Sequence, residues 1–176
     1  LSMKVKKFLF IGGSSVLAYN WSNIIKNNYE VVLVKNKTAI NQKGVQIINV
    51  VDFKYENLLS IIEQIEPDVL INCAAITNIE YCEKHIKESY KINVDLPSNL
   101  AKITKLNNIK FVQISTDHLF NGKKNFYSEK SIPDPLNVYA KTKYLAEKEV
   151  LKYNNRSLII RTNFFGWTNG HKKLFP

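Results

Sequence analysis

Tyr139 and Lys143 stand four residues apart in the stretch YAKTK, a spacing that places both side chains on one face of an α-helix. A lysine ammonium about 4 Å from a phenolate interacts with it by about 4 kcal/mol at an effective dielectric constant of about 20. That interaction would lower the pKa of the phenol from about 10 toward about 7, a range suited to general acid-base chemistry. The pair is therefore a candidate proton donor, although the same spacing also arises by chance.

A second candidate site lies near the N-terminus, where the stretch FLFIGGSSVLA reads as a buried strand, a Gly-Gly turn and a helix. Such a turn directs the amides of a helix N-terminus at a pyrophosphate. The spaced small positions are Gly12, Ser15 and Ala18, where the usual fingerprint has glycines. Ser15 can cap the helix or bind phosphate, and Ala18 is small enough for the helix to pack on the strand. We expect the pyrophosphate of a dinucleotide to lie over Gly12, Ser14, Ser15, Val16 and Leu17; a turn without a ligand is the alternative.

The residues after the next two apolar runs would select the cofactor. Lys35 and Lys37 follow the run VVLV, where an Asp or Glu would bind the ribose diol of NAD. These lysines would meet a 2′-phosphate instead, which slightly favours NADP over NAD, unless they are merely solvated. Asp52 follows the third run and would either approach the adenine or be a loop acid without a partner.

Short apolar runs alternate with longer segments of helical period, which is typical of strand-helix-strand units. Strands are expected at residues 6–11, 29–34, 45–50, 69–73, 110–115 and 157–161, and helices at 15–27, 54–65, 80–106 with a break, and 138–153. The connection between the second and third strands leaves little room for a helix, although parallel crossovers usually contain one. Since several strands are apolar on both faces, we predict a doubly wound parallel sheet, a Rossmann-type α/β fold. Ligands then bind just after the strands, near residues 12–18, 74–77, 116–118 and 162–166.

Composition excludes several classes of function. The 176 residues fit one domain, and the net charge of +10 comes from dispersed lysines with only two arginines, so we do not expect nucleic-acid binding. Two cysteines outside any Cys-x-x-Cys motif indicate a reduced, cytoplasmic protein. The three histidines lack metal-ligand spacing, and no apolar run approaches the roughly 18 residues of a membrane span. We therefore expect neither a metal site nor a membrane partner.

Five stretches together resemble the extended short-chain dehydrogenase/reductase superfamily, and within it the dTDP-4-dehydrorhamnose reductase family. They are PDVLINCAAITNIEYCE (67–83), INVDLPSNLA (92–101), FVQISTDHLFNG (111–122), DPLNVYAKTKYLAE (134–147) and RTNFFG (161–166). They follow one another in the family's order and cover most of the chain.

The resemblance implies a role for each motif residue. Tyr139 would donate a proton, Lys143 would tune it and hold the nicotinamide ribose, and Thr116 would hydrogen-bond the reacting oxygen, with Ser115 as the less favoured candidate. Ala74 and Ala75 would line the cofactor, and Asn93 would support the helix behind the lysine. Asn163, Phe164 and Phe165 would either approach the nicotinamide and sugar or form a turn capped by core aromatics.

The implied function is NAD(P)-dependent reduction of a nucleotide-linked 4-keto-deoxysugar for cell-surface polysaccharide synthesis, with a homodimer as one expected assembly. Alternatives are a nucleotide-sugar epimerase or dehydratase, and a non-catalytic dinucleotide-binding regulatory subunit. The chain departs from the family at His118, where a tyrosine is usual, and in its degraded glycine fingerprint. Family members also continue into a lobe that binds the nucleotide-sugar. We therefore expect residues 1–176 to form the NAD(P)-binding domain, with the substrate lobe absent.

Overall fold

The computed structural model describes residues 5–163, 166–167 and 173–174, and it contains a six-stranded, wholly parallel sheet. The strand order is β3-β2-β1-β4-β5-β6. The strands are β1 (Lys7–Ile11), β2 (Glu30–Lys35), β3 (Gln46–Asn49), β4 (Val69–Asn72), β5 (Lys110–Ile114) and β6 (Leu158–Ile160). A separate antiparallel pair consists of β7 (Gly166–Trp167) and β8 (Lys173–Leu174). All six predicted strands are confirmed.

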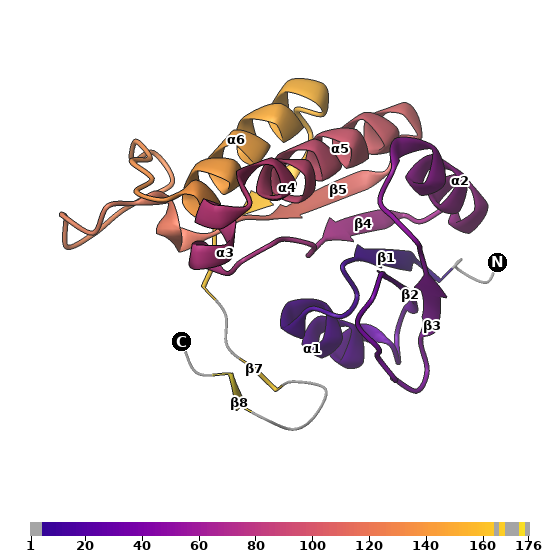
Figure 1. Ribbon diagram of the computed structural model, residues 1–176. Helices are drawn as coiled ribbons and strands as arrows, with labels where there is room; N and C mark the ends of the chain where they lie inside the picture. Colours follow the sequence, from indigo (N-terminus) through magenta and orange to yellow (C-terminus); the bar gives the residue numbers. More distant parts are fainter. Residues whose placement is uncertain (1–4, 164–165, 168–172, 175–176) are drawn as a thin grey trace.

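Helices cover both faces of the sheet, with α1 on one side and α2, α5 and α6 on the other (Figure 1). Their bounds are α1 (Val16–Ile25), α2 (Tyr55–Ile65), α3 (Ile79–Lys84), α4 (Ile86–Tyr90), the π-helical turn η1 (Lys91–Asp95), α5 (Leu96–Leu106), the 3₁₀ turn η2 (Asp117–Leu119) and α6 (Val138–Tyr153). This arrangement confirms the predicted doubly wound, Rossmann-type fold. The helical segment predicted at 80–106 is indeed broken, into α3, α4, η1 and α5.

The strands are apolar on both faces because each face meets helices. On β1, Leu9 and Ile11 belong to the core beneath α2 and α5, whereas Phe10 packs with Ala18 of α1. All four side chains are fully buried. The alternation of a strand therefore divides one apolar run between two cores.

The link from β2 to β3 contains no helix, as its length predicted, and yet the two strands are parallel. Its course is fixed by Gln42, a buried side chain whose Nε2 donates to Ser22 Oγ of α1 at 3.0 Å. The Lys26 ammonium of α1 also donates to the Lys43 carbonyl at 3.0 Å. The loop thus packs along α1 in place of a crossover helix.

The strand order reverses between β1 and β4, since the chain passes outward to β2 and β3 after β1, and to β5 and β6 after β4. The loops that leave the carboxyl ends of β1 and β4 therefore diverge and open a crevice. In doubly wound sheets this is where ligands bind. A ligand is therefore expected near Gly12 and near the loop that begins at Cys73.

A partly buried ion pair joins α6 to the end of β6, with the Arg161 side chain 24% exposed. Arg161 donates to both carboxylate oxygens of Glu147, with its Nη2 2.7 Å from Oε2, and the Glu147 side chain is only 6% exposed. Arg161 Nη1 also donates to the Glu129 carbonyl at 3.3 Å. The ion pair thereby joins the stretches 134–147 and 161–166, and the bond to Glu129 attaches the long loop before α6 to them.

Replacing Arg161 by Met should destabilise the fold by about 3 kcal/mol, because it leaves the Glu147 carboxylate buried without its partner. Replacing Glu147 by Leu in the same protein should restore most of that loss. Urea unfolding measures both effects. The exposed pair of Lys152 and Glu149, also on α6, provides the control: Glu149→Gln should barely move the midpoint. An unchanged midpoint in Arg161→Met would contradict this account.

Candidate active site

The turn after β1 is built from two glycines that no other residue could replace without displacement. Gly12 has φ +79°, and a Cβ there would lie 2.6 Å from the Ala74 nitrogen. A Cβ on Gly13 would lie 2.7 Å from Leu33 Cβ. The amides of both glycines donate to the Val34 carbonyl, at 3.0 and 2.8 Å. The turn is therefore wedged between the ends of β2 and β4.

The two substitutions in the glycine fingerprint are accommodated by the local structure. Ser15 is the N-cap of α1, and its Oγ accepts a hydrogen bond from Ala18 N at 3.2 Å. Ala18 is fully buried against the core that contains Phe10 and Ile71. Because the first amides of a helix have no partner within the helix, the N-terminus of α1 still offers donors to an anion. The turn retains the features that a pyrophosphate site needs.

A cavity of about 500 Å³ opens in front of this turn. It is lined by Gly12, Ser14, Ser15, Val16, Asn36, Lys37, Thr38, Phe53, Cys73, Ala74, Ala75, Thr77 and Ile92. A second cavity of about 240 Å³ shares Asn36, Phe53 and Ile92 with it and also contains Asp52. Most predicted cofactor residues thus surround one space. Leu17 does not line it, because its side chain packs into the core beside α1.

Lys35 differs from the expectation, since it does not line either of these two cavities. It still belongs to β2, where it pairs with Asn49 of β3, and its ammonium donates to Asn49 Oδ1 at 3.2 Å. Lys37, two residues later, does line the larger cavity. Of the two lysines, only Lys37 is placed to meet a ligand there.

Asp52 borders the smaller cavity, but its carboxylate also organises the start of α2. It accepts hydrogen bonds from Lys54 N at 3.1 Å and from Asn57 Nδ2 at 2.7 Å, and its Oδ2 lies 3.3 Å from the Lys54 ammonium. The hydrogen bond from the Lys54 amide is the main reason that the pKa of this carboxyl lies below its usual value. Asp52 is therefore not a loop acid without a partner.

The predicted catalytic side chains meet at the end of β5 and on the first turns of α6. Thr116, Tyr139 and Lys143 are all buried, the last with 4% of its surface exposed. The Thr116 hydroxyl donates to Asp117 Oδ1 at 3.3 Å, and the His118 ring stands edge-on to Tyr139 with the ring centroids 5.9 Å apart. The structure thus assembles the expected group of three.

The prediction that Lys143 lowers the pKa of Tyr139 is wrong for the protein without a cofactor. The pKa of Tyr139 is raised, chiefly by burial, while the hydrogen bond with Thr116 opposes the rise and the Asp117 charge adds to it. Lys143 Nζ donates to the Ile114 carbonyl at 2.6 Å, and burial lowers the pKa of this ammonium to about 8. Because the lysine is held by the backbone of β5, it does not stabilise the phenolate.

Cys73 connects the cavity to the catalytic group. It lines the cavity, and burial raises the pKa of its thiol to about 12. A hydrogen bond with Ser15 and the nearby charge of Lys143 both oppose that rise. Ser15 of the turn after β1 and Lys143 of α6 therefore both lie near this thiol.

Asn93 fastens the loop after β4 to α6. Its Oδ1 accepts from Ile76 N at 2.8 Å, and its Nδ2 donates to the Ile76 carbonyl and to Thr142 Oγ1, each at 3.0 Å. Asn93 lies in the π-helical turn η1, a form of helix that is frequent at functional sites. The support that the resemblance implied is thus present as three hydrogen bonds.

Sequence reasoning missed several residues of the site. Asn36 Nδ2 donates to the carbonyls of Val50 and Val51 at 3.0 and 2.6 Å and so closes one wall, while Thr38 and Phe53 line the cavity. A buried pair of amides, Asn72 and Gln113, lies below Lys143; polar residues within apolar strands were the available signal. Asn163 is exposed, and Phe164 and Phe165 lie outside the described residues.

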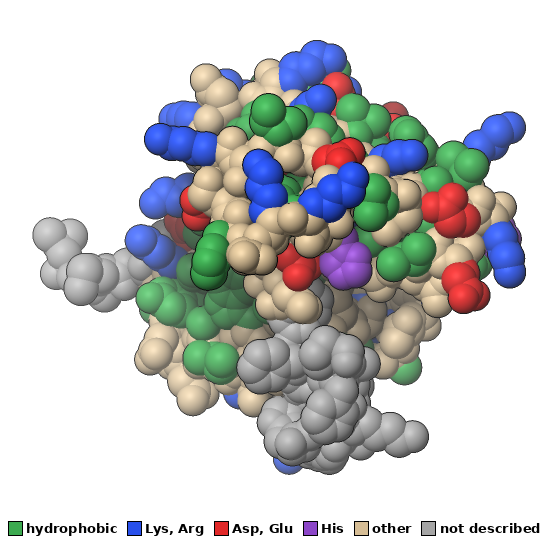
Figure 2. Space-filling model, turned by 90° about the vertical axis from the view of Figure 1, so that its left-hand side faces the viewer, with side chains coloured by type: hydrophobic (Ala, Val, Ile, Leu, Met, Phe, Trp, Pro, Cys, Tyr) green, Lys and Arg blue, Asp and Glu red, His purple; other side chains and the backbone are tan. Residues whose placement is uncertain are grey.

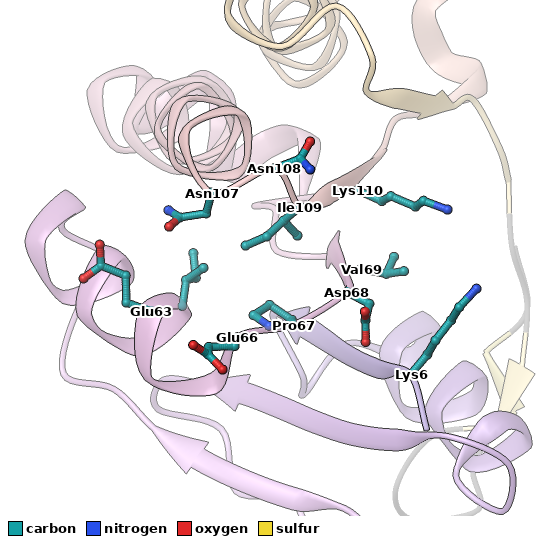
Figure 3. Close-up of a pocket in the computed structure, with 11 residues that line it drawn as sticks. Lys6, Glu63, Glu66, Pro67, Asp68, Val69, Asn107, Asn108, Ile109 and Lys110 are labelled. Carbon is teal, nitrogen blue, oxygen red and sulfur yellow. The ribbon is translucent and has the colours of Figure 1, made fainter. Parts of the chain in front are cut away.

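A further cavity of about 540 Å³ lies at the opposite edge of the sheet. Its wall carries Lys6, Glu63, Glu66, Asp68, Asn107, Asn108 and Lys110 (Figure 3). These residues lie in the last turn of α2, just after the carboxyl ends of α2 and α5, or at the starts of β1, β4 and β5. Since ligands of doubly wound sheets bind at the carboxyl ends of strands, this cavity is not the candidate active site.

Lys and Arg side chains are dispersed among acidic, apolar and other polar groups on the face shown in Figure 2. Within the described part of the chain, no three His, Cys, Asp or Glu side chains cluster in a way that could hold a metal ion. In the same residues, no helix combines the length and apolar character that a membrane span requires.

Comparison with known proteins gives three informative relatives. dTDP-4-dehydrorhamnose reductase from Aggregatibacter actinomycetemcomitans is 30% identical over 167 residues, which cover 93% of this chain and 52% of that protein. Methionine adenosyltransferase 2 subunit beta from Bos taurus is 36% identical over 115 residues, covering 62% and 34%. The structure of dTDP-4-dehydrorhamnose reductase from Bacillus anthracis in complex with NADP superposes with a TM-score of 0.78 at 23% identity, covering 92% and 54%.

This chain spans about half the length of the curated reductase that it matches, 52%. The family model described as the RmlD substrate binding domain matches residues 6–173, which is nearly all of it. The chain therefore belongs to the RmlD substrate binding domain family.

Proposed function

We propose that this chain is the NAD(P)-binding domain of a reductase that acts on a nucleotide-linked 4-keto-deoxysugar in polysaccharide synthesis. The observation that carries the proposal is that the cavity at the glycine turn and the group of Thr116, Tyr139 and Lys143 lie side by side at the carboxyl ends of the strands. Cys73, which lines the cavity, follows β4, and the Ile114 carbonyl that holds Lys143 ends the neighbouring strand β5. A cofactor and a proton donor would then act on the same carbonyl group.

The residues present fit a dinucleotide. A Cβ at Gly12 would fill the space that lets the turn approach Ala74, so a pyrophosphate can come close to the backbone there. Lys37 and Thr38 border the cavity beyond β2, where a 2′-phosphate would lie, and the smaller cavity with Asp52 and Phe53 would receive the adenine. The solved relative that contains NADP supports this choice of cofactor.

A bound nicotinamide would supply a hydride to the keto carbon of the sugar. Tyr139 would transfer its phenolic proton to the keto oxygen, and Thr116 would donate a hydrogen bond to that oxygen. The raised pKa of Tyr139 keeps the phenol protonated in the resting state, which is the form that an acid catalyst requires. Lys143 would turn from the Ile114 carbonyl to the ribose.

A regulatory, non-catalytic role is the second candidate, because methionine adenosyltransferase 2 subunit beta is 36% identical over 115 residues. An epimerase or dehydratase of the same superfamily is a third, although Asp117 is followed by His118 and not by a further carboxylate. The group of Thr116, Tyr139 and Lys143 favours an enzyme over the regulatory role, and the 30% identity to dTDP-4-dehydrorhamnose reductase favours the reductase over the epimerase or dehydratase. The free thiols of Cys73 and Cys82 support a cytoplasmic location, and the homodimer stays a prediction.

If Lys37 meets a 2′-phosphate, the protein should bind NADPH more tightly than NADH, and Lys37→Ala should reduce that preference about tenfold. Hydrogen bonds to charged groups contribute roughly 1.5 to 3 kcal/mol, which exceeds the required change. Lys35→Ala is the matched control and should leave the preference unchanged, because its ammonium is held at Asn49. Titration calorimetry with both cofactors measures the ratio. Equal affinities in the parent protein would remove the basis for this assignment.

Tyr139→Phe should retain cofactor affinity, because the ring still packs, but should lower turnover at least about 10²-fold through loss of general acid catalysis. The assay is NADPH oxidation by the whole gene product with a panel of nucleotide-linked 4-keto sugars. Tyr144→Phe on the same helix controls for loss of a hydroxyl outside the site. Full reductase activity in Tyr139→Phe would rule out the mechanism. If the parent protein binds cofactor but reduces none of the sugars, the regulatory role becomes the better explanation.

A further inference from the structure

A chain of buried hydrogen bonds runs beneath the catalytic lysine from the loop after β4. Ala74 N donates to Asn72 Oδ1 at 3.1 Å, and Asn72 Nδ2 donates to Gln113 Oε1 at 2.9 Å. Gln113 Nε2 then donates to the Ile114 carbonyl at 2.8 Å. Asn72 and Gln113 are each 1% exposed. Two neighbouring strands thus share a buried polar network at their carboxyl ends.

The network ends on the oxygen that holds Lys143. The Ile114 carbonyl accepts from Lys143 Nζ at 2.6 Å as well as from Gln113 Nε2. A carbonyl oxygen has two lone pairs, so both acceptor sites are occupied. The side chains of Gln113 and Lys143 therefore donate to the same oxygen atom.

The fold alone does not explain why this pair is polar. Asn72 and Gln113 occupy core positions in strands whose other buried residues are apolar, and an apolar pair of similar size would pack there without needing hydrogen bonds. A buried polar network is tolerated only when its members are satisfied. Here Gln113 uses both ends of its amide, one on Asn72 and one on the carbonyl shared with Lys143.

We propose that Gln113 is a positioning residue that keeps the Ile114 carbonyl hydrogen-bonded when Lys143 leaves it for the ribose of the cofactor. The inference deepens the proposed function and rests on it, since the ribose is the second partner of Lys143. With Gln113 in place, movement of the ammonium exposes no unpaired acceptor. Without it, the same movement would leave a buried carbonyl with no partner, which is costly.

A double-mutant cycle tests the proposal. Gln113→Met keeps the volume and removes the donor, and it should weaken NADPH binding about tenfold when Lys143 is present, because Lys143 must then abandon an otherwise unpaired carbonyl. In a Lys143→Met background there is no ammonium to release, so the added change should weaken binding less than about twofold. A loosened Asn72 or Ala74 would weaken binding equally in both backgrounds, and that result would overturn the proposal.

Gln42→Met is the matched control, since Gln42 is also buried but bonds to Ser22 of α1, away from Lys143. It should leave the affinity for NADPH within about twofold in either background, as expected for sites without shared partners. A tenfold loss in this control would show that any buried glutamine has the effect. The specific role of Gln113 would then be lost.

A second measurement uses the protein without cofactor. NMR titration of lysine labelled with ¹³C at Cε should give Lys143 a midpoint near its lowered pKa of about 8. Gln113→Met should raise that midpoint, because the N–H dipole beside the ammonium is removed and the carbonyl serves Lys143 alone. Gln113→Glu, which keeps the acceptor for Asn72, should raise it further through its charge and serves if the Met variant does not fold. Unchanged midpoints would refute the shared carbonyl.

The two measurements separate the possible failures. Suppose that the parent protein binds neither NADPH nor NADH, while Gln113→Met raises the titration midpoint of Lys143 as expected. The proposed function then fails, and the sharing of the Ile114 carbonyl stands. If the cofactor binds and the cycle shows no coupling, the proposed function stands and the role of Gln113 fails.

Discussion

The close approach of the Gly12 turn to Ala74 is the constraint on which the site depends. A Cβ at Gly12 would lie 2.6 Å from the Ala74 nitrogen, so the phosphate turn and the loop after β4 touch through their backbones alone. The cavity takes its shape from that contact, because one of its walls belongs to each segment. The same Ala74 amide begins the hydrogen bonds that end at Lys143. Steric fit at the turn is thereby linked to the position of the catalytic lysine.

Two polar connections then hold α6 relative to this contact. Asn93 joins Ile76 of the loop to Thr142, and Glu147 joins the far part of the helix to Arg161 after β6. Lys143 lies between these two points, and Tyr139 lies one turn before the first of them. A helix held at two points along its length cannot easily rotate, so the two side chains keep their direction toward the ends of β4 and β5. Precision in the site comes from hydrogen bonds between elements distant in the sequence.

The sequence predicted the sheet well because each strand is an apolar run bounded by turn residues. Strands that are buried on both faces give a continuous apolar run, which is easy to recognise. The sequence also singled out Gly12, Ser15, Tyr139 and Lys143 as candidate site residues by their spacing along the chain. Sequence reasoning failed for side chains whose hydrogen-bond partner is remote in the sequence. The carbonyl that takes Lys143 away from Tyr139 is 29 residues distant, and Asn49, which holds Lys35, lies on another strand. Pairings of that kind depend on strand register, which no local pattern contains.

The thiol of Cys73 bears on how the protein would withstand oxidative stress. Peroxides and electrophiles react with thiolates, and a pKa of about 12 leaves almost none of that form at neutral pH. A cysteine beside a redox cofactor would otherwise be a point of damage during turnover. Cys73 is only partly buried and lines the cavity, but its raised pKa keeps the thiol a weak nucleophile, so covalent inhibitors aimed at the cavity would react slowly with it. Ligands for this pocket would have to rely on shape and hydrogen bonding.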